Sequence, residues 1–494
     1  MIETVPAQLR YVCTLAFGTR LHTRSLDRLV TALLDAREEF GAIGRDAAEA
    51  LRGPELDDTT RREVQIRRFR TQAQLAARTP YYGRLFAELE FEPRNATWAD
   101  LEALPPTPKD ALEADPDAFV PRGARPAFRA LTTGTTGIPT TVYFSRAEFE
   151  ATVALGAISV LLGRQIEPGD VVQLSVSSRA LFPVMLAAQI AARVGAVVYQ
   201  AGFVDPGHAL ALLAEKRSLG GHSPQANVLS TVPSYLGSLV ERGAELGYRP
   251  RDFGVERVVL GGEVATQGLR DRATRLFGDV EYVEPYAATE IMGTGALTCL
   301  SGHLHFPVPP GLVEVLSLDG RRAAAPGEAG TLVVTPFAPY RTTTVVLRYD
   351  TADVVRVPAE PLTCELSTIP ATSNVLGKLA RSIPHSGGWT FPRDVAEALE
   401  ALEEVPLPAR FGMRADGDDG VAVEVVARED DTRTRRRIAA ALEPRMPLRA
   451  LRIVTDPAAL EDPVLLRTDL REHSFSDFGA PMLDAARPEE AVPA

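Results

Sequence analysis

Apolar side chains recur with a helical period near the start of the chain. Between Ser25 and Phe40 the pattern i, i+3, i+4 recurs in Leu26, Leu29, Val30, Leu33 and Leu34, so that these residues line one face of a helix. Similar segments continue to about residue 75. This pattern predicts a helical N-terminal extension over residues 1–75.

A different pattern begins near residue 170, where short apolar runs alternate with longer amphipathic segments. The runs predict strands at Val171–Val176, Ala196–Tyr199, Asn227–Val232 and Arg257–Leu260. The segments between them predict helices such as Phe182–Val194 and Pro233–Leu246. Alternation of strand and helix is typical of an α/β fold with a largely parallel sheet.

After about residue 300 the pattern is richer in β-strands, which we expect at Leu312–Leu316, Gly330–Thr335 and Thr343–Leu347. Beyond Gly377 the expected elements are a helix, a strand, a helix and a strand, at Pro392–Leu402, Val421–Ala427, Thr432–Leu442 and Ala450–Val454. The fold class is therefore α/β, with a large domain of layered α/β sheets at 76–377 and a small α+β domain at 378–478. We expect the Ala-, Pro- and Glu-rich residues 479–494 to be disordered.

Composition narrows the class of protein. The 494 residues are 45% hydrophobic and 24% charged, as in ordinary globular proteins. The 65 acidic residues outnumber the 53 basic ones, which argues against nucleic-acid binding because that needs a basic face. Three scattered cysteines predict a reducing cytoplasm, and no run is long enough for a membrane span or typical of a signal peptide. We expect a soluble cytoplasmic protein, and a homodimer is one possible assembly.

The most specific motif is Leu131-Thr132-Thr133-Gly134-Thr135-Thr136-Gly137-Ile138-Pro139-Thr140. Its glycines let backbone N–H groups converge, and its hydroxyls add donors, as a polyphosphate requires. It is not a Walker A loop, because no Gly-Lys-Ser/Thr follows.

This run resembles the phosphate loop of adenylate-forming enzymes, the superfamily that contains acyl-CoA synthetases, peptide-synthetase adenylation domains and luciferases. Thr79-Pro80-Tyr81-Tyr82-Gly83 and Leu104-Pro105-Pro106-Thr107-Pro108-Lys109-Asp110 extend the similarity to the phenylacetate-CoA ligase branch. The resemblance covers roughly residues 79–455 and leaves the N-terminal extension unassigned. It implies ATP and Mg²⁺ as cofactors.

Further segments resemble the nucleotide-binding motifs of that superfamily. By this resemblance, Tyr286 packs on adenine with Ala287 beside it, Thr289 contacts phosphate and Glu290 reaches Mg²⁺. Asp353, in Arg348-Tyr349-Asp350-Thr351-Ala352-Asp353, is similar to the ribose ligand. A carboxylate suits a diol because it offers two acceptors side by side. Gly261, Gly262 and Glu263 look like the loop beside the adenine.

Two departures from the superfamily pattern concern catalysis. The interdomain hinge keeps a glycine and a cation, Gly377 and Lys378, but has lost its acidic residues. Most relatives carry a lysine near the C-terminus that bridges the carboxylate and the α-phosphate, and this chain has no lysine after Lys378. Arg467 and Arg471 are candidate replacements, as is Lys378.

A group of cysteines and histidines allows two interpretations. Cys299, His305 and Cys364, with His303 nearby, are similar to a zinc site in some members of this branch, although Leu362 stands where those members have another cysteine. The alternative is two buried cysteines beside surface histidines.

The expected function is an ATP-dependent, AMP-forming ligase. It would activate an aryl or aryl-acrylic acid as acyl-AMP and transfer it to an amine or to the thiol of coenzyme A or a carrier protein, in secondary metabolism. The candidate residues of the acid pocket are Arg179, Phe182, Ser234 and Tyr235. Two alternatives stay open: a diazotase that activates nitrite with ATP and diazotises an aryl amine, and a nucleotide-binding pseudoenzyme.

Overall fold

A computed structural model describes residues 6–10, 13, 23–41, 57–132, 140–177 and 181–464 of the chain. It forms two compact units, each built from three stretches of chain. The first unit contains Met1–Pro168, Arg179–Ala196 and Val283–Ser382, and the second contains Gly169–Ser178, Val197–Tyr282 and Ile383–Ala494. The boundary expected near Lys378 stays a prediction; the chain leaves the first unit close to it, at Ser382.

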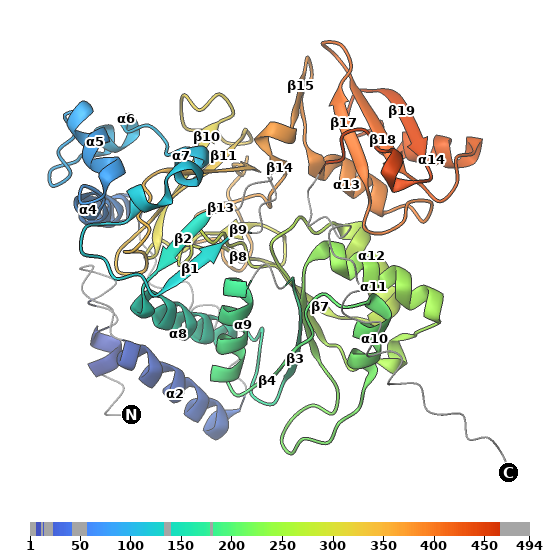
Figure 1. The fold of residues 1–494 in the computed structure, drawn as a ribbon, viewed down its shortest axis with the longest axis horizontal. Helices are drawn as coiled ribbons and strands as arrows, with labels where there is room; N and C mark the ends of the chain where they lie inside the picture. The colour runs from blue at the N-terminus through green and yellow to red at the C-terminus, as the bar shows by residue number, and fades with distance from the viewer. Residues whose placement is uncertain are drawn as a thin grey trace. The chain divides into compact units, whose positions relative to one another are not determined.

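The first unit contains the helices of the N-terminal part of the chain (Figure 1). They are α2 (Thr23–Phe40), α4 (Asp58–Ala76), α5 (Pro80–Glu88), α6 (Trp98–Ala103), α7 (Lys109–Ala114), α8 (Arg146–Leu162) and α9 (Leu181–Arg193). Helices α2 and α4 lie where the sequence predicts helices, and a separate extension over residues 1–75 stays a prediction. Helix α2 packs on α8 through Leu26, which contacts Ala151 and Ala154, and Arg37 forms an ion pair with Glu167 at 2.9 Å.

Three small sheets complete the first unit. A hairpin joins β1 (Phe128–Leu131) to β2 (Thr141–Phe144). An antiparallel sheet has the order β10-β11-β12-β14, formed by Gly311–Ser317, Ala329–Pro336, Tyr349–Arg356 and Gly377–Lys378. The third sheet has the order β13-β9-β8, formed by Ala371–Thr372, Leu304–His305 and Leu297–Thr298.

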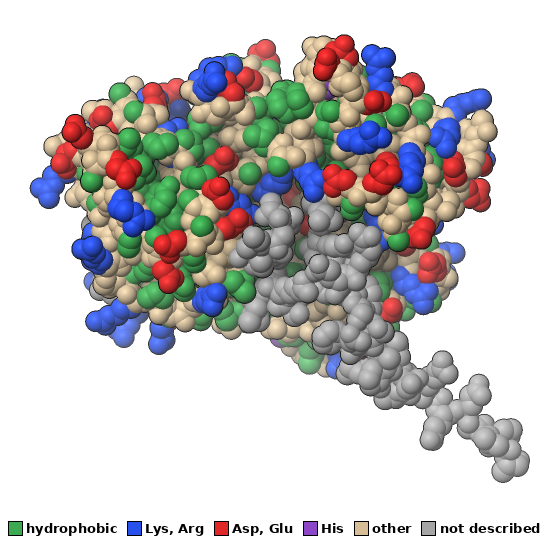
Figure 2. All heavy atoms as spheres, turned by 45° about the horizontal axis from the view of Figure 1, so that its top comes forward, with side chains coloured by type: hydrophobic (Ala, Val, Ile, Leu, Met, Phe, Trp, Pro, Cys, Tyr) green, Lys and Arg blue, Asp and Glu red, His purple; other side chains and the backbone are tan. Residues whose placement is uncertain are grey.

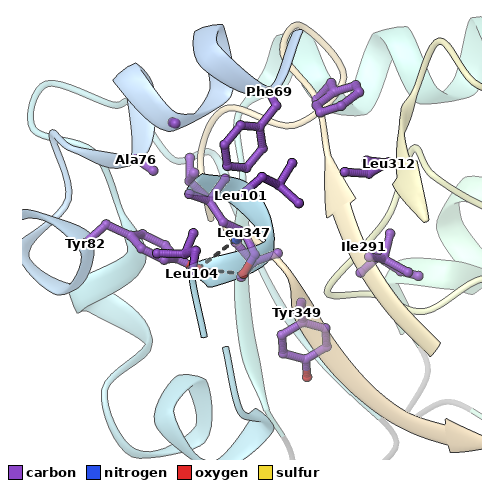
Figure 3. Packing of buried hydrophobic residues seen from close by; sticks show 14 of the residues in the cluster. Phe69, Ala76, Tyr82, Leu101, Leu104, Ile291, Leu312, Leu347 and Tyr349 are labelled. Atoms are coloured by element: carbon purple, nitrogen blue, oxygen red, sulfur yellow. Dashed lines mark hydrogen bonds between the residues drawn. The ribbon is translucent and has the colours of Figure 1, made fainter. Parts of the chain in front are cut away.

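Helix α4 forms part of the main core of this unit. Its residues Phe69 and Ala76 are fully buried, together with Tyr82 of α5 and Leu347 beside β12 (Figure 3). The Tyr82 hydroxyl accepts a hydrogen bond from the backbone N–H of Leu347 at 2.7 Å. The N-terminal helices are therefore part of the core on which β12 is positioned.

The second unit contains the parallel sheet that the sequence predicts. Its strand order is β4-β3-β5-β6-β7, formed by Val197–Gln200, Val171–Ser175, Val228–Thr231, Arg257–Leu260 and Glu281–Val283. Strand β3 pairs in parallel with β4 and β5, and β5 pairs in parallel with β6. The helices of this part are α10 (Pro206–Ala214), α11 (Pro233–Leu246) and α12 (Gln267–Phe277).

The C-terminal part of the second unit is a small α+β fold, as expected. Its sheet has the order β17-β18-β19, formed by Phe411–Ala415, Val421–Val426 and Leu448–Val454. The remaining elements are the hairpin of β15 (Ile383–His385) and β16 (Gly388–Thr390), and the helices α13 (Pro392–Glu400) and α14 (Thr432–Leu442). Residues 479–494 lie outside the described residues.

One predicted strand is wrong. Thr343–Leu347 is not a strand; it is a buried irregular segment. Its N–H groups have separate partners: Thr343 donates to Glu148 of α8, Val345 to the carbonyl oxygen of Phe119, and Leu347 to the Tyr82 hydroxyl. A run of apolar and β-branched residues indicates burial, but it does not show whether the partner is a strand or a side chain.

No helix among the described residues is long and apolar enough to span a membrane. Acidic and basic side chains are intermixed over the face drawn in Figure 2.

Replacement of Phe69 by alanine tests the packing of α4. Because the ring is fully buried, we expect the free energy of unfolding to fall by about 3–5 kcal/mol in chemical denaturation. Leu89→Ala is the control, since Leu89 is 47% exposed, and it should change stability by no more than about 0.5 kcal/mol. Equal effects of the two substitutions would contradict this packing.

Candidate functional site

Two predicted motifs of the first unit are linked by a pair of hydrogen bonds. The Tyr286 hydroxyl donates to Asp353 Oδ2 at 2.8 Å, and the Tyr349 hydroxyl donates to Glu290 Oε1 at 3.1 Å. Each motif thus contributes one phenol and one carboxylate. The ribose-ligand candidate and the magnesium-ligand candidate are thereby held by the same two segments.

The tyrosines stay protonated donors in this arrangement. Burial raises the pKa of Tyr349, and the negative charge of Glu290 raises it further. Burial and the charge of Asp353 raise the pKa of Tyr286 in the same way. Both phenols therefore keep their protons at neutral pH and fix the orientation of the carboxylates.

The pairing of β12 with β11 is irregular next to Asp353. Between β11 and β12 the register shifts, so that Thr331 pairs with Val354 and Val333 pairs with Asp350. Ala352 lies at the shift with a φ of 57°, in the left-handed region that costs an L-residue energy. This irregularity brings Asp353 opposite Lys378 of β14.

Lys378 is the second partner of Asp353. Its Nζ lies 2.9 Å from Asp353 Oδ1 and also donates to the carbonyl oxygen of Thr351 at 2.9 Å. Each oxygen of Asp353 thus has one partner, and each keeps a further acceptor position for a hydroxyl group. Lys378, a predicted catalytic cation, therefore forms an ion pair with Asp353, the ribose-ligand candidate.

Thr289 and Glu290 are buried at a turn that follows Tyr286. Tyr286 forms a two-residue antiparallel bridge with Ala296, which closes this loop, and Ala287 is exposed beside it. Glu290 Oε2 accepts no hydrogen bond from any described residue, whereas Oε1 is held by Tyr349. One carboxylate oxygen oriented in this way is suited to a Mg²⁺ ligand.

The phosphate-loop motif begins at Leu131, the last residue of β1, and ends at Thr140, directly before β2. The backbone groups of Thr132 and Thr140 pair at 3.0 Å, and the Thr132 hydroxyl accepts the N–H of Thr140 at 2.9 Å. Thr132 therefore closes the hairpin. Thr133, Gly134, Thr135, Thr136 and Gly137 lie outside the described residues, as do Arg179, Arg467 and Arg471.

The second unit holds the loop expected beside adenine. Gly262 has a φ of 78°, which disfavours any side chain there. A Cβ on Gly261 or Gly262 would meet no described atom within 4 Å, so there is open space beside this backbone. Glu263 is used differently: it accepts hydrogen bonds from the Ser234 N–H and hydroxyl at 2.8 and 3.0 Å, and caps the start of α11.

The described candidates for the acid pocket are buried side chains. Ser234 is bound to Glu263, and the Tyr235 hydroxyl donates to the carbonyl oxygen of Val204 at 2.6 Å. These two residues belong to the second unit, and Phe182 belongs to the first, where it stacks on Phe144 at 4.2 Å between ring centroids. The structure does not bring the three together within one unit.

Cysteine and histidine side chains meet in the first unit around β8 and β9. The ligand atoms of Cys299, His303, His305 and Cys364 all lie within 4.8 Å of one another. Cys299 Sγ is 3.4 Å from His303 Nδ1, and Cys364 Sγ is 3.3 Å from His305 Nε2. His305 is fully buried, so the interpretation as a surface histidine is wrong for this residue.

The donor set of this cluster fits zinc. Two thiols and two imidazoles are a common structural zinc set, and bond lengths of about 2.0–2.3 Å place neighbouring ligand atoms at about the separations observed. His305 Nδ1 lies 3.1 Å from the carbonyl oxygen of Ile369, which orients Nε2 toward Cys364. Burial lowers the pKa of His305, which favours the neutral ring that a metal requires.

Sequence reasoning missed Tyr349 as a site residue. It lies inside the motif that identified Asp353, but a tyrosine in a strand is most often a core residue. Only the fold shows that its hydroxyl reaches Glu290.

No family model matches the chain. A curated relative, the phenylacetate-coenzyme A ligase of Thermus thermophilus, is 27% identical over 382 residues, which cover 74% of this chain and 81% of that protein.

Solved structures share the fold. A 2-hydroxyisobutyryl-CoA ligase in its postadenylation state, in complex with an acyl-AMP, has a TM-score of 0.67 at 19% identity and covers 83% of this chain and 88% of its own. A benzoate CoA ligase from Burkholderia xenovorans has a TM-score of 0.50 at 17% identity and covers 68% of this chain and 67% of its own. The predicted fold class and the predicted resemblance to adenylate-forming CoA ligases are confirmed.

Two substitutions at Ala352 test the backbone geometry that places Asp353. A β-branched residue is strained at a positive φ, so Ala352→Val should lower the free energy of unfolding by about 1–3 kcal/mol. Ala352→Gly is the matched control, since glycine adopts this φ freely, and it should be neutral or slightly stabilising. Both are measured by chemical denaturation, and a valine variant as stable as the glycine variant would contradict the geometry.

Proposed function

We propose that this relative of the phenylacetate-CoA ligases is an ATP-dependent, AMP-forming ligase that converts a carboxylic acid into its coenzyme A thioester. The observation that carries the proposal is the pair of hydrogen bonds between the two motifs, from Tyr286 to Asp353 and from Tyr349 to Glu290. The named relatives in sequence and fold are CoA ligases.

Nucleotide recognition is assigned to three segments. Asp353 accepts hydrogen bonds from the two ribose hydroxyls through the acceptor positions that Tyr286 and Lys378 leave open. Gly261 and Gly262 let the adenine approach the backbone, a role supported by the open space beside them. The loop from Thr132 to Thr140 takes the phosphates.

The reaction has two steps. A carboxylate oxygen of the acid attacks the α-phosphorus of ATP, so that a new P–O bond forms and pyrophosphate leaves. The coenzyme A sulfur then attacks the acyl carbon, and AMP leaves with the electron pair of the broken C–O bond. In both steps the protein binds and orients the reactants and stabilises charge.

Glu290 and Thr289 serve the phosphate end of the site. Glu290 would hold Mg²⁺, which would supply positive charge to neutralise the polyphosphate. Tyr349 keeps Glu290 in one orientation, and we assign Thr289 as a hydroxyl donor to a phosphate oxygen.

We assign an aryl or aryl-acrylic acid as the substrate, in secondary metabolism in a reducing cytoplasm, with a carrier-protein thiol or an amine as alternative acceptors. The phenylacetate-CoA ligase in the comparison supports the aryl class. Ser234 and Tyr235 have their polar groups bonded within the protein. They would therefore contribute shape to a pocket, rather than a hydrogen bond to the acid.

Pyrophosphate release with a panel of acids tests the function. The panel contains aryl, aryl-acrylic and short acyl acids, each with ATP, Mg²⁺ and coenzyme A, and a separate arm contains nitrite with an aryl amine. We expect an acid to accelerate release and AMP and an acyl-CoA to accumulate. AMP formed only with nitrite and amine together would identify a diazotase instead, and binding of ATP without turnover in any arm would identify a pseudoenzyme.

Two variants separate the roles of the carboxylates in the same assay. Asp353→Ala removes the ribose ligand, so the KM for ATP should rise at least about tenfold through the loss of hydrogen bonds to a charged acceptor. Glu290→Gln keeps the shape and the Tyr349 contact but removes a charge, so it should lower kcat more than it raises the KM for ATP. The reverse pattern would contradict the assignment.

The Cys299, His303, His305 and Cys364 cluster is proposed as a structural zinc site. The three predicted donors and His303 lie together, and four protein ligands would leave no position for a substrate, as is typical of a structural site. Zinc bound by this cluster, around β8 and β9, would stabilise the segment that follows the Tyr286–Glu290 loop.

Metal analysis tests the zinc site. The purified protein should contain one zinc per chain by inductively coupled plasma mass spectrometry, and Cys364→Ser should lose the metal and lower the melting temperature. Cys13→Ser is the control, since Cys13 is exposed and outside the cluster. A metal-free wild type whose stability does not change when zinc is added would contradict the proposal.

A further inference from the structure

A buried arginine in the first unit carries hydrogen-bond donors that the described part of the chain does not use. Arg341 is 0% exposed, and none of its three guanidinium nitrogens, Nε, Nη1 and Nη2, has a hydrogen-bond partner among the described residues. Its Cζ lies 4.0 Å from the centroid of the Phe144 ring. Buried charges in proteins are normally paired, because an unpaired charge is costly to remove from water.

Arg348, also in the first unit, shows what a structural arginine looks like. It is 4% exposed, and its guanidinium binds both carboxylate oxygens of Glu314 and the carbonyl oxygens of Leu101, Glu102 and Leu104. Arg341 is as deeply buried but has no such partners within the described ranges. Packing alone therefore does not account for a guanidinium at this position.

Glu148 and Glu290, the two carboxylates whose charges act on Arg341, do not supply the missing hydrogen-bond partners. Burial lowers the pKa of Arg341 to about 10, and the charges of Glu148 and Glu290 oppose that shift. Glu148 is occupied by hydrogen bonds from the N–H groups of Ser145, Thr342 and Thr343 and from the Thr343 hydroxyl. Glu290 is bound to Tyr349. Arg341 thus stays positively charged at neutral pH.

The fold places this charge beside the nucleotide motifs. Phe144, under the guanidinium, ends β2, the strand that follows the phosphate-loop motif. Glu290 is the proposed magnesium ligand. The backbone of Arg341 is held by Gln72 of α4, whose Nε2 donates to the Arg341 carbonyl oxygen at 3.1 Å, so the side chain begins from a fixed point.

We propose that Arg341 is an oxyanion ligand of the adenylation site. The oxyanion is a phosphate oxygen of the nucleotide or the carboxylate of the acid; either can accept two parallel N–H bonds from a guanidinium. The proposal rests on the function proposed above. Arg341 donates hydrogen bonds and transfers no proton, and its charge acts strongly because water is excluded around it. Since its nitrogens are shielded from solvent, an anion must displace neighbouring groups to reach them.

Two substitutions separate this role from a structural one. Arg341→Met keeps a long unbranched side chain but removes the charge, and Arg341→Lys keeps the charge without the planar fork. Because the charge is buried and lacks a described partner, we expect the ligand-free Met variant to melt at or above the wild-type temperature. The rate of acid-dependent pyrophosphate release should fall about 10²–10³-fold, as for other lost transition-state donors. The Lys variant should recover part of the rate.

Ligand-induced melting shifts identify the anion. AMP, pyrophosphate, the carboxylic acid and nitrite are each added alone to wild type and to the Met variant. Loss of the shift with AMP or pyrophosphate assigns the phosphate, and loss with the acid or nitrite assigns that oxyanion. Arg322→Met, at an exposed arginine paired with Glu328, is the control and should keep every shift.

The inference is overturned if Arg341→Met keeps the rate and all shifts within about twofold, or if it only lowers the melting temperature and leaves the kinetics of the folded fraction unchanged. These outcomes differ from failure of the proposed function. In that case wild type releases no pyrophosphate with any acid, while the melting shifts still show whether Arg341 binds an anion.

Discussion

Two phenol–carboxylate hydrogen bonds hold the candidate site together. Tyr286 with Asp353 and Tyr349 with Glu290 join the loop after β7 to strand β12, and each bond crosses from one motif to the other. Because both phenols are buried beside negative charge, their pKa values are raised and they remain donors. The separation between Asp353 and Glu290, the proposed ribose and magnesium ligands, is therefore set within the protein itself, which would lower the ordering cost of binding a nucleotide.

The rest of the first unit supports these bonds. The core formed by α4 and α5 reaches the start of β12 through the hydrogen bond between Tyr82 and Leu347. The left-handed Ala352 then turns Asp353 toward Lys378. Gln72 of α4 also holds the segment that carries Arg341. The N-terminal helices, which the resemblance to known enzymes does not cover fully, are thus part of the support for the site.

Sequence reasoning could predict periodic elements and motif residues, but it could not predict contacts between side chains. The predicted parallel strands agree with the observed ones to within about two residues at each end, because alternating runs of strand and helix leave little choice. The strand predicted at Thr343–Leu347 was wrong because its N–H groups bond to scattered partners, among them Glu148 and the Tyr82 hydroxyl, and to no neighbouring strand in the described part of the chain. Tyr349 and Arg341 were missed for a related reason. The sequence does not show which atoms contact a buried tyrosine, or that a buried arginine has no hydrogen-bond partner among the described residues.

The most direct test is a structure of the protein with AMP bound. If the two motifs form the nucleotide site, both ribose hydroxyls will lie within hydrogen-bond distance of the Asp353 carboxylate, at about 2.5–3.0 Å. The Tyr286 and Tyr349 contacts will be kept, and the phosphate will lie on the side of Glu290. An AMP bound elsewhere, or an Asp353 whose only partners are still Tyr286 and Lys378, would contradict the account.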